Sequence, residues 1–172
     1  MRRWAQGIAY PKDFVFKPDT SKQQKGLHLP LAITVPHRAD ALERIGQRFS
    51  EISGMPVERI FILAPLHKGK LDFAGNEQIY TWEGMEHVEG AVENDDVCSE
   101  EYCAEMLLPF CEGTFPGVPV QAFFATGKTD KTEKIVNNLL KGFPKSLFIV
   151  SNNSDTNCAA MWRNGVIDDL QG

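Results

Sequence analysis

Two histidines of this chain follow apolar segments in the same way, and both have the chemistry of a metal ligand. His37 comes after the segment 29–35 and one proline, and His67 comes two residues after Pro65, which follows the apolar run 60–64. A neutral imidazole is a common ligand of divalent iron, zinc and copper. Histidines that follow neighbouring parallel strands meet at one edge of a sheet, so the pair predicts a metal site.

An iron or zinc site of this kind needs a third protein ligand, commonly a carboxylate, a histidine or a thiolate. By their positions in the chain, the candidates for this ligand are Glu105, Asp155 and Cys158. The local sequence does not single one of them out, so the third ligand stays open. The alternative explanation is that each histidine only caps a helix or hydrogen-bonds a loop carbonyl.

The segments that must position these residues show two kinds of hydrophobic pattern in alternation. Short apolar runs predict buried strands, and apolar positions at helical spacing predict amphipathic helices. Strands are expected at 29–35, 59–64, 118–127 and 145–151, and helices at 38–53, 99–111, 131–143 and about 154–170. Residues 68–98 are acidic and dotted with glycine, and are expected to form a loop or hairpin. The alternation predicts an α/β fold, a three-layer α/β/α sandwich with a mostly parallel sheet.

Composition and charge bound the organisation and the partners of the chain. Its 172 residues, 42% of them hydrophobic, suffice for one core, so residues 1–172 are expected to form a single domain. The net charge is -5 and no run of lysine and arginine could follow a phosphate backbone, which argues against nucleic-acid binding. No apolar run approaches a membrane span and no secretion signal is recognisable, so we expect no membrane partner and a cytoplasmic location. The four cysteines lack CxxC pairs and are expected to be reduced, partly buried thiols.

Five segments occur in the order and approximate spacing of motifs from one known family. They are GIAYP at 7–11, VPHRAD at 35–40, FILAPLHKG at 61–69, EEYCAEMLLPFCEGTFPGVPV at 100–120 and LFIVSNNSDT at 147–156. Together they resemble the Memo-like proteins, also named AmmeMemoRadiSam system protein B, which are similar to the catalytic subunits of class III extradiol dioxygenases. The resemblance implies that His37 and His67 lie on the metal side of a cleft with Glu105 beside it. It also implies a divalent metal, Fe, Zn or Cu, as the cofactor.

The chain departs from the family pattern at positions that matter for proton transfer. Tyr102 stands where the family's helix has a histidine, and Thr156 stands where the family's last turn has one. The unperturbed pKa of tyrosine lies near ~10, so neither residue replaces a histidine as an acid or base at neutral pH. The family also takes a further metal-site residue from a part that follows the position of Gly172. We therefore expect a divergent, C-terminally shortened member.

Two functions are compatible with these features. The first is a divergent Memo-like protein with a remnant metal-site cleft, weakly catalytic or non-catalytic, which serves as a binding or structural module and covers exposed surface by forming a homo-oligomer. The alternative is a metal-dependent oxidoreductase or dioxygenase-like enzyme that acts on a small molecule at Fe or a similar ion. In both, the metal ligands His37 and His67 should face one cleft, while the catalytic residues and the substrate stay open. The other residues expected in or beside this cleft are Glu105, Tyr102, Asp155 and Thr156.

Overall fold

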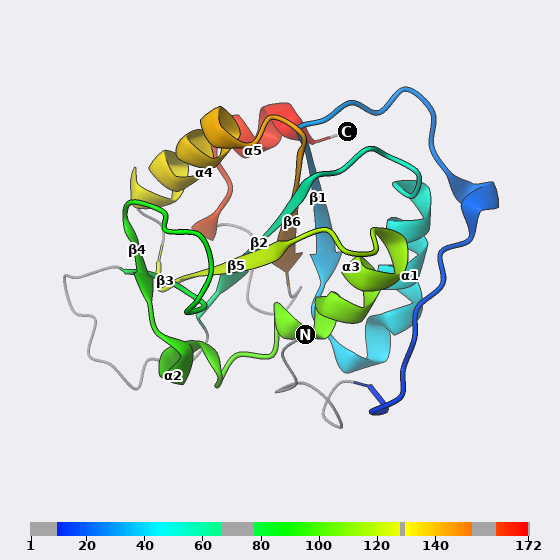
Figure 1. The fold of residues 1–172 in the computed structure, drawn as a ribbon, viewed down its shortest axis with the longest axis horizontal. Helices are drawn as coiled ribbons and strands as arrows, with labels where there is room; N and C mark the ends of the chain where they lie inside the picture. The colour runs from blue at the N-terminus through cyan, green and yellow to red at the C-terminus, as the bar shows by residue number, and fades with distance from the viewer. Residues whose placement is uncertain (1–9, 67–77, 128–129, 153–160, 172) are drawn as a thin grey trace.

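The computed structural model describes residues 10–66, 78–127, 130–152 and 161–171 (Figure 1). In this part of the chain a six-stranded sheet has the strand order β1-β6-β2-β5-β3-β4. The strands are β1 (Leu31–Pro36), β2 (Arg59–Pro65), β3 (Ile79–Thr81), β4 (Ala91–Glu93), β5 (Val120–Ala125) and β6 (Ser146–Asn152). The α-helices are α1 (Leu42–Glu51), α2 (Asp95–Cys98), α3 (Leu108–Thr114), α4 (Asp130–Gly142) and α5 (Gly165–Leu170). Short 3-10 turns are formed by Thr20–Lys22, Ala39–Ala41 and Glu105–Leu107.

Four of the strands, β1, β6, β2 and β5, run parallel to one another. β3 runs antiparallel to β5 and pairs in parallel with β4. The register places Val35 opposite Ser151 and Pro36 opposite Asn152, so β1 and β6 end level with each other. On the side away from β1, β6 pairs in parallel with β2, and β2 ends at the same edge of the sheet as β1 and β6. We call the edge formed by the carboxyl ends of β1, β6 and β2 the strand-end edge.

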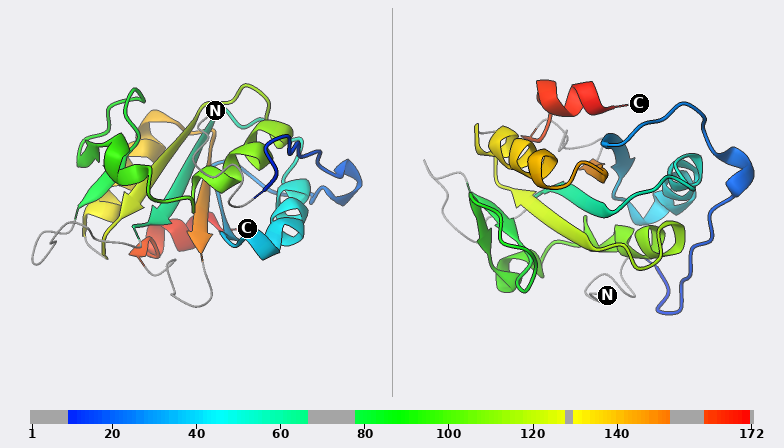
Figure 2. Two further views of the ribbon diagram at one scale, coloured as in Figure 1. Left: turned by 90° about the horizontal axis from the view of Figure 1, so that it is seen from below. Right: turned by 45° about the horizontal axis from the view of Figure 1, so that its top comes forward.

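Helices cover both faces of the sheet, as Figure 2 shows. α1 and α3 lie on one face, where the rings of Phe49 and Phe110 stack with their centroids 5.7 Å apart. α4 and α5 lie on the other face, where Ile135 and Ile167 belong to a second apolar cluster. Because both faces are covered, β2 is buried at every position after its first, instead of alternating between buried and exposed residues. These observations confirm the predicted three-layer α/β/α sandwich with a mostly parallel sheet.

The segment between β2 and β5 differs from its predicted structure. The helix predicted at 99–111 begins later, because the 3-10 turn Glu105–Leu107 leads into α3, and Ser99 ends α2 instead of starting a helix. Pro109 lies in the first turn of α3, where its missing N–H is not needed, whereas a helix starting at Ser99 would place it in the interior. The described part of 68–98, which begins at residue 78, contributes β3, β4 and α2, whereas the sequence predicts a loop or hairpin.

The other helices lie close to their predicted positions. α1 carries the expected apolar stripe, with Ile45 and Phe49 buried, and the 3-10 turn Ala39–Ala41 replaces the first turn of the predicted helix. α5 covers only the end of the helix predicted at about 154–170: residues 161–164 are described and not α-helical, because Asn164 caps the start of α5 by accepting from the Ile167 N–H, and residues 154–160 lie outside the described part. Among the described helices, none has the length and apolarity that crossing a membrane requires. The described cysteines are buried free thiols, as predicted: Cys98, Cys103 and Cys111.

Candidate functional site

His37 lies directly beyond the end of β1, at the strand-end edge. Its backbone N–H donates to the carbonyl oxygen of Asn152 at the end of β6, with 3.0 Å between nitrogen and oxygen. This bond fixes the histidine relative to both strands. The residue is 1% exposed although it follows the last residue of the strand. His37 is therefore held inside the molecule and not presented on its surface.

A hydrogen-bonded chain of three groups fixes the imidazole ring. Nδ1 of His37 lies 2.9 Å from Oγ of Ser151, and the Ser151 hydroxyl donates to the carbonyl oxygen of Cys103 at 2.7 Å. A serine hydroxyl has one proton, so with that proton directed at Cys103 its oxygen accepts from His37. The imidazole thus carries a proton on Nδ1, and in the neutral ring the lone pair is on Nε2. Such a hydrogen bond to the far ring nitrogen is typical of histidines that ligate metals.

Cys103 also ties this chain of groups to β2. Its thiol donates to the carbonyl oxygen of Pro65, the last residue of β2, with 3.5 Å between sulfur and oxygen. The same sulfur lies 3.7 Å from Oε2 of Glu101. Through its carbonyl and its thiol, Cys103 joins the ends of β6 and β2. The three strand ends are therefore held in fixed positions by side chains of His37, Ser151 and Cys103.

Two glutamates next to Cys103 are buried, which is unusual for ionisable side chains. Glu101 is 4% exposed, and Glu105 is fully buried at the start of the 3-10 turn before α3. Burial, and in addition the negative charge of Glu105, raises the pKa of Tyr10 to about 12. Glu105 is therefore an interior side chain and not a residue of the protein surface. That Glu105 lies beside a metal-binding cleft, as the resemblance implies, stays a prediction.

Tyr102 is placed differently from the residues on either side of it. It is 40% exposed, whereas Glu101 and Cys103 are buried. The sequence predicts that Tyr102 shares a helical face with Met106 and Leu107, and this prediction is wrong, because the last two are buried and residues 101–104 form no helix. Tyr102 therefore does not join the buried polar groups of the strand-end edge.

A hollow of ≈ 380 Å³ lies beside His37 at the ends of β1 and β6. Arg38 and Asp40 face each other there in a two-point ion pair, with both nitrogen–oxygen distances 3.1 Å. His37 does not line the hollow, although the residues before and after it do. The lining consists of Thr34, Val35, Pro36, Arg38, Asp40, Ala41, Arg44 and Asn152.

The remaining predicted site residues lie outside the described part of the chain: His67, Asp155, Thr156 and Cys158. Among the described residues, no group of three or more histidine, cysteine, aspartate or glutamate side chains is placed to hold a metal ion. His37 has the ring orientation of a ligand, but the described donors do not complete a site around it. The described residues alone thus do not fit a divalent metal. That His37 and His67 face one cleft stays a prediction.

Comparisons with protein-family models, with curated proteins and with solved structures gave no match. The resemblance to the Memo-like proteins therefore rests on the sequence motifs. Ser151, Cys103 and Glu101 stand inside the motif segments, but the resemblance gives none of them a site role, and the structure brings them together around His37. One signal was available for Ser151, because it is the first polar residue after the apolar run of β6, at the edge where the histidine was expected.

Proposed function

We propose that this chain is a divergent Memo-like protein whose strand-end edge is a remnant of a metal-site cleft, and that it acts as a binding module with weak or no catalysis. The observation that carries the proposal is the burial of His37, whose Nδ1 is engaged with Ser151. A general acid or base must reach the proton that it transfers, directly or through one water. The hollow beside His37 is lined by other side chains, so the imidazole does not face a substrate placed in that hollow.

The polar groups of the strand-end edge support a structural role. The Ser151 hydroxyl accepts a hydrogen bond from His37 and donates one to the Cys103 carbonyl. The Cys103 thiol donates to the Pro65 carbonyl at the end of β2. A buried polar group that loses its partner destabilises a fold by about 1–3 kcal/mol, so each member of this network supports the next. The network stabilises the three strand ends whether or not a reaction takes place there.

The metal-dependent oxidoreductase is the second candidate, and one observation favours it. The hydrogen bond between Nδ1 and Ser151 leaves the lone pair of the neutral His37 ring on Nε2, which is the atom that would bind iron or a similar ion. That ion would polarise and activate a bound small molecule. A complete site would require His67 and a third ligand in addition to His37.

Metal analysis of untagged protein, combined with a catechol-cleavage assay in the presence of Fe(II), separates the two functions. The decisive variant is His37→Asn, because its side-chain amide places an N–H near the position of Nδ1 and provides no counterpart of Nε2. The matched control is His87→Ala, which removes an exposed histidine. The binding-module proposal expects substoichiometric metal that dialysis against a chelator removes, and little turnover in any of the three proteins.

Stoichiometric metal and ring cleavage in the wild type and in His87→Ala, both lost in a folded His37→Asn protein, would show instead that the chain is the enzyme. Circular dichroism of each variant establishes that the fold is retained. With this control, loss of metal cannot be confused with unfolding.

A further inference from the structure

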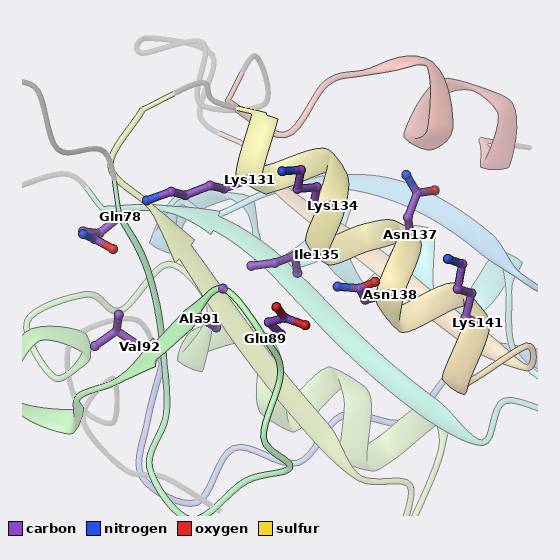
Figure 3. Close-up of a pocket in the computed structure, with 11 residues that line it drawn as sticks. Gln78, Glu89, Ala91, Val92, Lys131, Lys134, Ile135, Asn137, Asn138 and Lys141 are labelled. Atoms are coloured by element: carbon purple, nitrogen blue, oxygen red, sulfur yellow. The ribbon is translucent and has the colours of Figure 1, made fainter.

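A groove lies between α4 and the β3–β4 side of the sheet, as Figure 3 shows. Its volume is ≈ 800 Å³, which is within the range of about 300–1,000 Å³ that is typical of small-molecule sites. The sheet order puts β3 and β4 at the opposite side from β1, so this groove is separate from the hollow beside His37. It is the larger of the two spaces.

The groove is positively charged although the chain has a net charge of -5. Three lysines of α4 line it, Lys131, Lys134 and Lys141, whose spacing of three and seven residues puts them on one side of the helix. Glu89 is the acidic side chain of the lining and lies on the opposite wall. Within the described part of the chain, neither Lys134 nor Lys141 forms an ion pair. The groove thus attracts an anion.

Between the lysines of α4 and strand β4, the groove is lined by side-chain amides and has apolar residues at its bottom. Figure 3 shows that Ile135 and Asn138 point from α4 into the groove and that Glu89 lies opposite Asn138. Ile135 is 1% exposed. Gly90 has a positive φ of 92°, and a Cβ atom at this position would lie 3.8 Å from Cγ1 of Ile135, so the two walls approach each other at the floor. Gln78 adds a further amide at the end of the groove near Lys131.

We propose that this groove binds a phosphorylated small molecule with a flat apolar body, of the size of a nucleoside monophosphate. The lysines of α4 attract the phosphate as point charges. The apolar lining at Ala91 and Val92 contacts the flat body, and Asn138 and Glu89 hydrogen-bond its polar edge. An acidic peptide fits less well, because the three residues of β4 are too few to add a strand.

Calorimetric titration of the full chain with adenosine monophosphate tests the proposal. The variant Lys134→Glu/Lys141→Glu reverses two charges of the groove. The matched control is Lys17→Glu/Lys25→Glu, which makes the same charge change at exposed lysines of the amino-terminal segment, on the side of the molecule that carries α1 (Figure 1). We expect the groove variant to bind roughly tenfold more weakly than the wild type, and the control to bind less than roughly threefold more weakly.

Adenosine and inorganic phosphate, titrated separately, test the two halves of the proposed ligand. Each should bind more weakly than the monophosphate, and the amide resonances of Gly90 and Asn138 should shift when the monophosphate binds. Equal weakening in both double variants would mean that only the net charge matters, and would overturn the proposal. So would the absence of binding, shifts confined to other residues, or phosphate alone binding as tightly as the monophosphate. His37→Asn should bind the monophosphate normally, so this result is independent of the function proposed for the strand-end edge.

Discussion

The strand-end edge and the α4 groove both carry polar side chains, but they hold them in opposite ways. At the strand-end edge, His37 and Ser151 are buried and bonded to each other. In the groove, Lys134 and Asn138 are exposed and line open space. Of the residue types that indicate catalysis, the described histidine thus lies inside the molecule, next to a hollow of ≈ 380 Å³, whereas the groove of ≈ 800 Å³ lies beside residues without an obvious catalytic role. A reactive side chain and a place for a ligand are separate requirements, and this chain meets them in different regions.

The largest effect on stability is expected from replacing Trp162, which supports the end of β2 at the strand-end edge. Its ring is fully buried, and Nε1 donates to the carbonyl oxygen of Ala64 at 2.8 Å. Trp162→Ala should lower the free energy of unfolding by about 4 kcal/mol, because it leaves a large cavity. Trp162→Phe should lower it by about 1–3 kcal/mol, because the Ala64 carbonyl loses its donor. Urea denaturation measures both, and a loss below about 1 kcal/mol for the alanine variant would mean that the edge is loosely packed.

The next effect concerns two serines of β6. Ser151→Ala should destabilise the protein by about 2 kcal/mol, because His37 and the Cys103 carbonyl both lose a buried partner. Ser146→Ala should be close to neutral, since the Ser146 hydroxyl is buried without a hydrogen-bond partner among the described residues. Urea midpoints of the two variants give the comparison directly. Equal midpoints would show that the network at the strand-end edge adds no stability.

A smaller effect is expected at the floor of the groove. Gly90→Ala should destabilise by about 1 kcal/mol, because the positive φ of 92° is unfavourable for a residue with a side chain. The contact that the new Cβ would make with Ile135, at 3.8 Å, is an ordinary one, so backbone conformation is the main cause. Gly142→Ala, at the end of α4, has open space around the new methyl group and should be neutral or slightly stabilising. Destabilisation of both variants to the same extent would contradict this explanation, and thermal unfolding measures it.

The smallest effect at neutral pH is expected from Tyr10→Phe, because the hydroxyl of Tyr10 has no hydrogen-bond partner among the described residues. The pKa of Tyr10 is raised to about 12 in the folded protein, against an ordinary value of 10.0. The unfolded chain therefore loses the tyrosine proton first, and the stability that the neutral phenol contributes below pH 10.0 is lost as the pH rises towards about 12. In that interval the wild type should lose more stability than Tyr10→Phe. Melting temperatures measured against pH decide this, and parallel curves would count against the raised pKa.

The long buried strands could be predicted from the sequence, and the short ones could not. β1, β2, β5 and β6 have six or seven residues each and are built around short, mostly apolar runs, which is the pattern of a parallel strand covered on both faces. β3 and β4 have three residues each, too few for any period, and their pairing depends on the position of β5. The start of α3 could have been inferred from Pro109, which is tolerated in the first turn of a helix and not in the interior.

The candidate site was predictable in its location and not in its contacts. The position of His37 at the end of a strand follows from the apolar run before it. The partner of its ring, Ser151, is 114 residues away, and only the register of β1 against β6 brings the two together. No local pattern encodes such a register. The exposure of Tyr102 between two buried neighbours could not be inferred from helical spacing, because residues 101–104 form no helix.

The two outermost strands of the sheet have a consequence for association between copies of the chain. An unpaired strand edge is a template on which another chain can add a strand, and long apolar edges carry the greatest risk of aggregation. β1 has six residues, and Gln171 forms a bridge to Ala32 and donates from its side chain to Thr34, so part of that edge is covered. β4 is short and ends in an exposed glutamate. Growth of a continuous sheet from one molecule to the next is therefore disfavoured at both ends of the sheet in the described part of the chain.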